Sequence, residues 1–177
     1  EYWGVYTLAE EFSDHHLANH YGLKDENIIT IKKSKVEDGT EEDENLFWDM
    51  YRFITENDMA DAALYQTATE LVDIKSMADY AAVTLYIANE DGIFHYNNWM
   101  MWRVRQPERN PHPYADGRWR MVLYDSDYSS DVYGDGNAYG INTIKNLLFQ
   151  EYEAWHPARM ITSLMKNEHF RREMVLS

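Results

Sequence analysis

The chain has 177 residues, of which 45% are hydrophobic, and this favours one domain, or a large part of one, with a substantial core. A formal net charge of −15 argues against nucleic acid and anionic membranes as partners. It suits cationic proteins or divalent metals, although an acidic surface also serves solubility alone. The absence of Cys excludes disulfides, zinc–thiolate sites and Cys nucleophiles, and no apolar run approaches the roughly 18 residues of a membrane-spanning helix.

The N-terminal part of the chain predicts two strands and a helix. Residues 2–8 alternate β-forming side chains and predict a strand, and residues 27–33, rich in Ile, predict another. Between them, residues 14–21 predict a short helix, with a Ser before it as the N-cap and a Gly after it as the stop. The acidic residues 34–45 contain an Asp-Gly pair and predict a mobile, solvated loop.

Helical periodicity dominates the middle of the chain. Residues 46–55 carry an apolar stripe typical of a helix, and residues 58–69 predict a second one. Asp73 is a good N-cap for a third helix over residues 74–88. The side chains expected on the buried face of this third helix are Ile74, Met77, Ala78, Ala81, Ala82 and Leu85.

A β-hairpin is expected next. Residues 99–104 and 119–124 are apolar strand candidates, and residues 106–117, with three prolines and an Asp-Gly pair, form the connecting loop. Residues 142–153 and 157–174 predict two helices that close the chain.

Polar side chains stand at both ends of this hairpin. The loop of residues 89–98 contains Asp91 and Asn98 and enters the first strand, while Asp125 and Asp127 follow the second strand directly. Because antiparallel pairing brings the start of one strand beside the end of the other, these side chains are expected to converge on one point.

Protein kinases use the same order of groups. An Asp in the catalytic loop accepts the substrate hydroxyl proton, an Asn a few residues later binds Mg²⁺, and an Asp after a hairpin binds Mg²⁺ at the phosphates. Asp91 fits the base, Asn98 and Asp125 fit the metal ligands, and Asp127 fits a second carboxylate ligand. The plain alternative is that these are turn residues. Asn98 also lies seven residues after Asp91, later than the roughly five-residue spacing of protein kinases.

Several segments resemble the spore coat protein H (CotH) kinase family. Residues 2–10 resemble its G-x-Y-x-x-x-E segment, and residues 73–80 resemble its helix before the catalytic loop. Residues 89–103 are similar to its Asp and Asn-Asn loop with the following Trp-Arg strand. Residues 119–127 match its W-x-x-x-x-x-D-x-D signature, and residues 164–174 resemble its closing helix.

The resemblance implies an α+β, atypical protein-kinase-like C-terminal lobe, mostly helical, with a β-hairpin carrying the site. It implies an Mg²⁺-dependent enzyme that transfers phosphate from ATP to Ser of a protein substrate, located outside the cell, at the cell surface or on the spore coat. Leu8, Glu10 and Glu11 would form the adenine hinge. Residues 1–177 would then be a partial domain, hinge and C-lobe without the N-lobe, and would transfer phosphate poorly alone. The longer loop would let Glu90 share the role of Asp91.

Two other classes of function stay open. One is a catalytically silent CotH-like module that binds a partner at the cell surface or spore coat, and the other is a domain stabilised by a metal. The Asp-rich run after Asp125 is similar to a calcium loop, but an EF-hand requires Gly and Glu where this chain has Ser130 and Gly136. An irregular calcium site remains an alternative.

Two pairs of basic side chains have both a functional and an ordinary interpretation. His16 and His20 lie one helical turn apart and could share a metal, but no third ligand is evident nearby in the sequence, so an exposed helix face is preferred. Lys32 and Lys33 could approach a phosphate, but a solvated pair at a strand end is the more ordinary interpretation.

Overall fold

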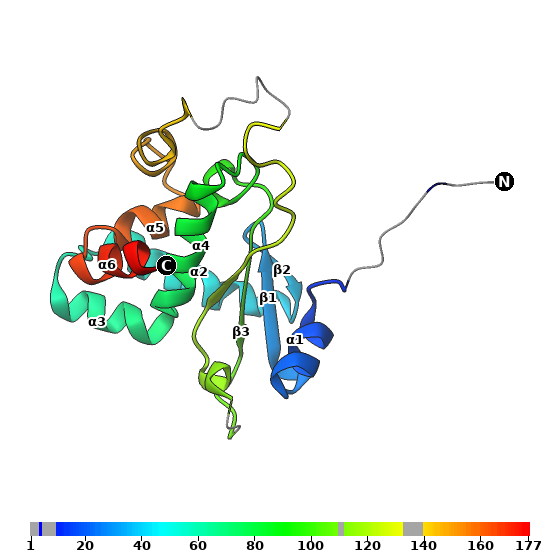
Figure 1. Cartoon of the computed structure of the whole chain (residues 1–177). Helices are drawn as coiled ribbons and strands as arrows, with labels where there is room; N and C mark the ends of the chain where they lie inside the picture. The colour runs from blue at the N-terminus through cyan, green and yellow to red at the C-terminus, as the bar shows by residue number, and fades with distance from the viewer. Residues whose placement is uncertain (1–3, 5–9, 110–111, 133–139) are drawn as a thin grey trace.

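The computed structural model describes residues 4, 10–109, 112–132 and 140–177, so the expected strand over residues 2–8 and Leu8 lie outside the described residues. It has an α+β, kinase-like fold with a small sheet and helices on both sides (Figure 1). Helix α1 (Asp14–Tyr21) covers one face of the sheet, and the larger helical layer packs on the other. Within the described residues, no helix is long and apolar enough to cross a bilayer.

The sheet has four antiparallel strands. Their order is β2 (Lys35–Asp38), β1 (Ile28–Lys32), β3 (Met100–Val104) and β4 (Arg120–Val122). The expected pairing of residues 99–104 with residues 119–124 is therefore confirmed, and the register sets Met100 opposite Val122. Strand residues alternate between the two faces, so β1 and β3 contribute to both hydrophobic clusters.

The prediction of a loop over residues 34–45 is wrong, although most side chains of this segment are exposed as predicted. Lys33 and Ser34 adopt positive φ angles of 50° and 63° and turn the chain into β2, an edge strand. A 3₁₀ turn follows, and its last residue, Asp43, is buried and accepts hydrogen bonds of 2.9 and 2.7 Å from the guanidinium of Arg105. The acidic composition predicted exposure of the whole segment. Asp43 is buried instead, because its cationic partner, Arg105, comes from a distant part of the chain.

The Asp43–Arg105 pair predicts a pH-dependent stability. Hydrogen bonds from Arg105 lower the pKa of Asp43 from its ordinary value of 3.8 to about 2. A lowered folded-state pKa stabilises the fold above pH 4, by about 2 kcal/mol, and this contribution is lost as the pH falls from about 4 to 2. Denaturant unfolding of the wild type and Asp43→Asn should therefore give a stability difference that shrinks over this range. A difference that stays constant from pH 6 to 2.5 would contradict it.

Most helices appear where the sequence places them. Helix α1 has the expected caps, with Ser13 Oγ accepting from the N–H of His16 and a left-handed Gly22 at its end. Asp73 caps α4 (Ile74–Tyr86), whose expected buried face is present except that Ala82 is only partly buried. Helices α2 and α3, over Glu44–Glu56 and Ala62–Leu71, correspond to the two helices expected before α4.

The C-terminal helices differ from expectation. The helix expected over residues 142–153 is only a π-helical turn over Ile144–Leu148. The single helix expected over residues 157–174 is two helices, α5 (Ala158–Leu164) and α6 (Glu168–Leu176). Asn167 explains the break, because its side chain caps α6 through the N–H of His169 and also donates to a backbone carbonyl before α3. Apolar periodicity continues across such a cap, so the pattern alone shows one helix.

Candidate active site

The loop after α4 and the segment after β4 meet at one end of the sheet. Since Met100 pairs with Val122 and Met101 with Met121, the same register continued past Met100 leads Asn98 toward Tyr124, next to Asp125. The two segments are also joined directly: the N–H of Glu90 donates to the carbonyl of Tyr128 at 2.9 Å. The loop that enters the hairpin and the segment that leaves it therefore lie side by side at this end of the sheet.

The carboxylate of Asp91 is held by two carboxamides. Nδ2 of Asn97 donates to one of its oxygens, and Nδ2 of Asn98 donates to the other at 2.9 Å. The backbone of Asp91 is held as well, because its N–H donates to Oδ1 of Asn89 at 2.7 Å and its carbonyl accepts from the N–H of Asn98 at 2.6 Å. Each carboxylate oxygen still has a second lone pair, so the group is oriented and remains able to accept a proton.

Negative charge accumulates after β4. A hydrogen bond with Asp127, partial desolvation and the charges of Asp127 and Asp91 raise the pKa of Asp125, while the charge of Lys32 opposes this. Burial, with the charges of Asp125, Glu37 and Asp91, raises the pKa of Tyr124 to about 12. The charges of Asp91 and Asp127 thus both act on Asp125, which is an arrangement that a cation would stabilise.

The backbone of Asp125 is unusual. Its φ of 48° lies in the left-handed region, which Asp tolerates better than most residues but which is still uncommon. Ser130 and Asp131 share this conformation, and the N–H of Ser130 donates to the carbonyl of Ile87 at 2.8 Å. Strained backbone held by surrounding contacts is typical of functional sites.

A cavity of about 620 Å³ opens beside Asp125. Lys32, Tyr124 and Asp125 line it together with Glu10 and Glu11, whereas Asp91, Asn98 and Asp127 are not among its lining residues. The volume lies within the range of small-molecule sites. The structure therefore brings the expected hinge residues Glu10 and Glu11 to the same cavity as Asp125.

The donor set fits a hard divalent cation. Asp125 and Asp127 offer carboxylate oxygens, and Asn98, whose Nδ2 faces Asp91, has its carbonyl oxygen free of that contact. Mg²⁺ prefers oxygen ligands, and two neighbouring carboxylates with one raised pKa provide the negative charge that it would neutralise. Asn98, Asp125 and Asp127 would be the ligands.

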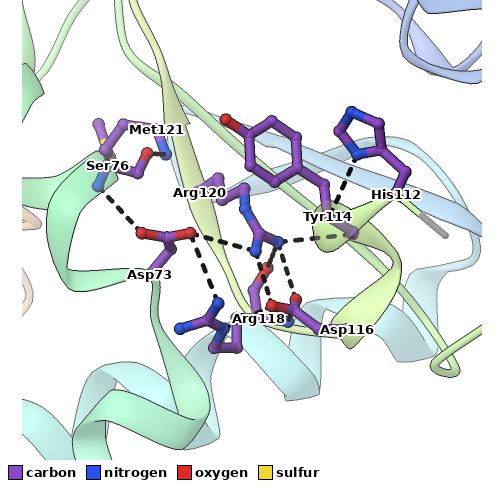
Figure 2. A network of polar contacts seen from close by, with 8 residues as sticks. All are labelled: Asp73, Ser76, His112, Tyr114, Asp116, Arg118, Arg120 and Met121. Carbon is purple, nitrogen blue, oxygen red and sulfur yellow. Dashed lines mark hydrogen bonds and ion pairs between the residues drawn. The ribbon is translucent and has the colours of Figure 1, made fainter. Parts of the chain in front are cut away.

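The buried side chain of Arg120 links α4 and β4, the two elements that precede the candidate site residues in the chain (Figure 2). Arg120 on β4 is 3% exposed, and its guanidinium lies 3.1 Å from Asp73, the cap of α4, and 2.8 Å from Asp116. Burial raises the pKa of Asp116, but hydrogen bonds from Arg120 and Arg118 outweigh it and lower the value to about 2. This network therefore holds the start of α4, the helix that leads to Asp91, against β4, the strand that leads to Asp125.

Sequence reasoning missed several neighbours of these groups. Asn89 orients Asp91, yet it looks like an ordinary loop residue in the sequence, and Asn97, part of the expected Asn-Asn loop, orients Asp91 as well. Lys32, interpreted above as a solvated strand end, lies on the cavity with its ammonium 5.4 Å from the Tyr124 ring centroid. Glu90 lines a different cavity, while the hydrogen bonds from Asn97 and Asn98 go to the carboxylate of Asp91.

The comparisons with known proteins agree with the resemblance drawn from the sequence. No curated protein and no solved structure matches the chain. The family model described as CotH kinase protein matches residues 1–176, essentially the whole sequence. The chain belongs to the CotH kinase protein family.

Proposed function

We propose that this protein is an atypical protein kinase that transfers the γ-phosphate of ATP to Ser of a protein substrate in an Mg²⁺-dependent reaction. The observation that carries the proposal is the Asp91 carboxylate, oriented by Asn97 and Asn98 and within electrostatic reach of Asp125. Membership of a kinase family supports this assignment.

Asp91 acts as the general base. Its carboxylate accepts the proton of the Ser hydroxyl as the hydroxyl oxygen forms a bond to the γ-phosphorus and the bond from that phosphorus to the β–γ bridging oxygen breaks, which releases ADP. The two carboxamides hold the base in one orientation, so little rearrangement is needed when the substrate arrives.

The nucleotide occupies the cavity beside Asp125. Asn98, Asp125 and Asp127 would hold Mg²⁺, which would neutralise phosphate charge there. Lys32 lines the cavity and would contact a phosphate, and Glu10 and Glu11, which also line it, would belong to the adenine hinge, with Leu8 added from the family resemblance alone.

The acidic character of the chain favours a cationic protein substrate, since a net charge of −15 attracts basic segments and repels nucleic acid. Membership of the CotH family, whose name refers to spore coat protein H, supports the spore coat, or more broadly the cell surface, as the place where the protein works.

Transfer of phosphate in vitro tests the proposal. The full-length native protein, γ-labelled ATP, Mg²⁺ and a Ser-containing basic protein acceptor should give label on Ser, and chelation of Mg²⁺ should remove it. Nucleotide binding without label on any acceptor, the protein itself included, would favour the catalytically silent binding module instead.

A further inference from the structure

Three metal-ligating side chains meet between α1 and the segment before it. Oε2 of Glu10 lies 3.0 Å from Nε2 of His20 and 3.3 Å from Nδ1 of His16. The three ligand atoms all lie within 4.8 Å of one another. We propose that Glu10, His16 and His20 form a binding site for Zn²⁺, separate from the Asp91–Asp125 site.

The two distances from Glu10 are close to those of a tetrahedral site. Ligand atoms at about 2.0–2.1 Å from Zn²⁺ and at tetrahedral angles lie about 3.3 Å apart, near the two distances from Glu10. The His rings come from positions i and i+4 of α1, and their centroids are 4.3 Å apart. The third ligand is Glu10, which the local sequence pattern did not indicate and which reaches both His side chains because the chain before α1 folds back onto the helix.

The ring of His16 is already positioned. Its side chain is 17% exposed, and Phe12 packs edge-on against it with a centroid distance of 4.9 Å. Nδ1 of His16 is buried and makes no regular hydrogen bond to any described residue, although it faces the Glu10 carboxylate. This nitrogen faces Oε2 of Glu10, the same oxygen that the imidazole of His20 contacts. A cation bound between the three groups would give the buried nitrogen a partner.

The donor set selects the metal. Two imidazole nitrogens and one carboxylate suit Zn²⁺, which takes nitrogen and oxygen ligands in a four-coordinate site, whereas Mg²⁺ prefers oxygen. Three protein ligands leave the fourth position to water, which the exposure of Glu10 and His20 permits, at 73% and 51%.

Zn²⁺ at this site would fasten the segment before α1 to the helix. Glu10 and Phe12 both line the 620 Å³ cavity, so the bound ion would fix one wall of it. The metal site rests on its own geometry and on two His side chains that have no role in the proposed kinase reaction, while Glu10 also belongs to the expected adenine hinge.

Calorimetric titration of chelator-treated protein with ZnCl₂ tests the proposal. The wild type should bind one Zn²⁺ per chain at this site, and His20→Gln and Glu10→Gln should each weaken its binding at least about tenfold. His15→Gln is the matched control, because His15 lies on the same helix but faces Asp25 at 3.1 Å, and it should bind as the wild type does. Excess Mg²⁺ should leave the binding unchanged.

Two outcomes would overturn the site. If Zn²⁺ binds His20→Gln as tightly as the wild type, the three side chains form only an ion pair. If binding is lost in Asp125→Asn but kept in His20→Gln, Zn²⁺ occupies the acidic cavity instead. Thermal unfolding gives a second readout: Zn²⁺ should raise the midpoint of the wild type and of His15→Gln but not that of His20→Gln. Because His20 is half exposed, its variant should fold.

Discussion

The Asp91→Asn protein is expected to transfer phosphate about 10²–10⁴ times more slowly than the wild type, with ATP binding changed by only a few fold. The amide cannot accept the proton of the substrate hydroxyl, but the base makes little contact with ground-state ATP. Asn is nearly isosteric with Asp, so most of the loop held by Asn89, Asn97 and Asn98 should persist. The measurement is transfer from γ-labelled ATP, beside calorimetric binding of a non-hydrolysable analogue, both with the full-length native protein.

Glu90→Gln provides the matched control for Asp91→Asn. It removes a neighbouring carboxylate that lines a different cavity, and we expect it to keep wild-type transfer. If Glu90→Gln loses transfer and Asp91→Asn does not, the general base is Glu90 instead of Asp91, and the rest of the mechanism stands. If the wild type and both variants transfer phosphate equally, neither Asp91 nor Glu90 is the general base.

The largest effect on stability is expected at Arg120. Arg120→Ala should lower the free energy of unfolding by about 3–5 kcal/mol, because it leaves the carboxylates of Asp73 and Asp116 without their buried partner. The guanidinium also lies 4.4 Å from the ring centroid of Tyr114, so packing is lost together with charge. Urea denaturation, read at equilibrium by circular dichroism, measures the change.

Arg118→Ala is the control for Arg120→Ala. Arg118 contacts the same carboxylate of Asp116 at 2.6 Å but is 35% exposed, so its removal should cost about 1 kcal/mol or less. If Arg120→Ala is no more destabilising than Arg118→Ala, the network of Figure 2 does not hold α4 against β4.

Local sequence signals predicted the elements that carry the site. The cap and apolar face of α4 depend on residues within that helix, and the hairpin follows from two apolar runs around a Pro-rich loop. Once the hairpin is predicted, antiparallel pairing alone places the loop with Asp91 and Asn98 near Asp125. The order of elements therefore contained most of what is needed to find the candidate site.

Contacts between distant segments account for what sequence did not predict. Strand β2 is short and charged, as edge strands often are, and its composition resembles a loop. Lys32 is part of the cavity only because β1 lies beside β3, and Glu10 meets His16 and His20 only because the chain folds back onto α1. None of these arrangements has a local periodic signal.

Magnesium-dependent nucleotide binding tests the central claim most directly. Calorimetric titration of the full-length native protein with a non-hydrolysable ATP analogue should show binding that requires Mg²⁺ and is weakened at least about tenfold by Asp125→Asn, which removes a charged metal ligand. Asp49→Asn, the same change at an exposed position on α2 that pairs with Arg52, should bind like the wild type. Without Mg²⁺, the wild type and Asp125→Asn should bind equally weakly. If Asp125→Asn retains the full Mg²⁺-dependent affinity, Asp125 is not a metal ligand and the kinase-like assignment of this site is wrong.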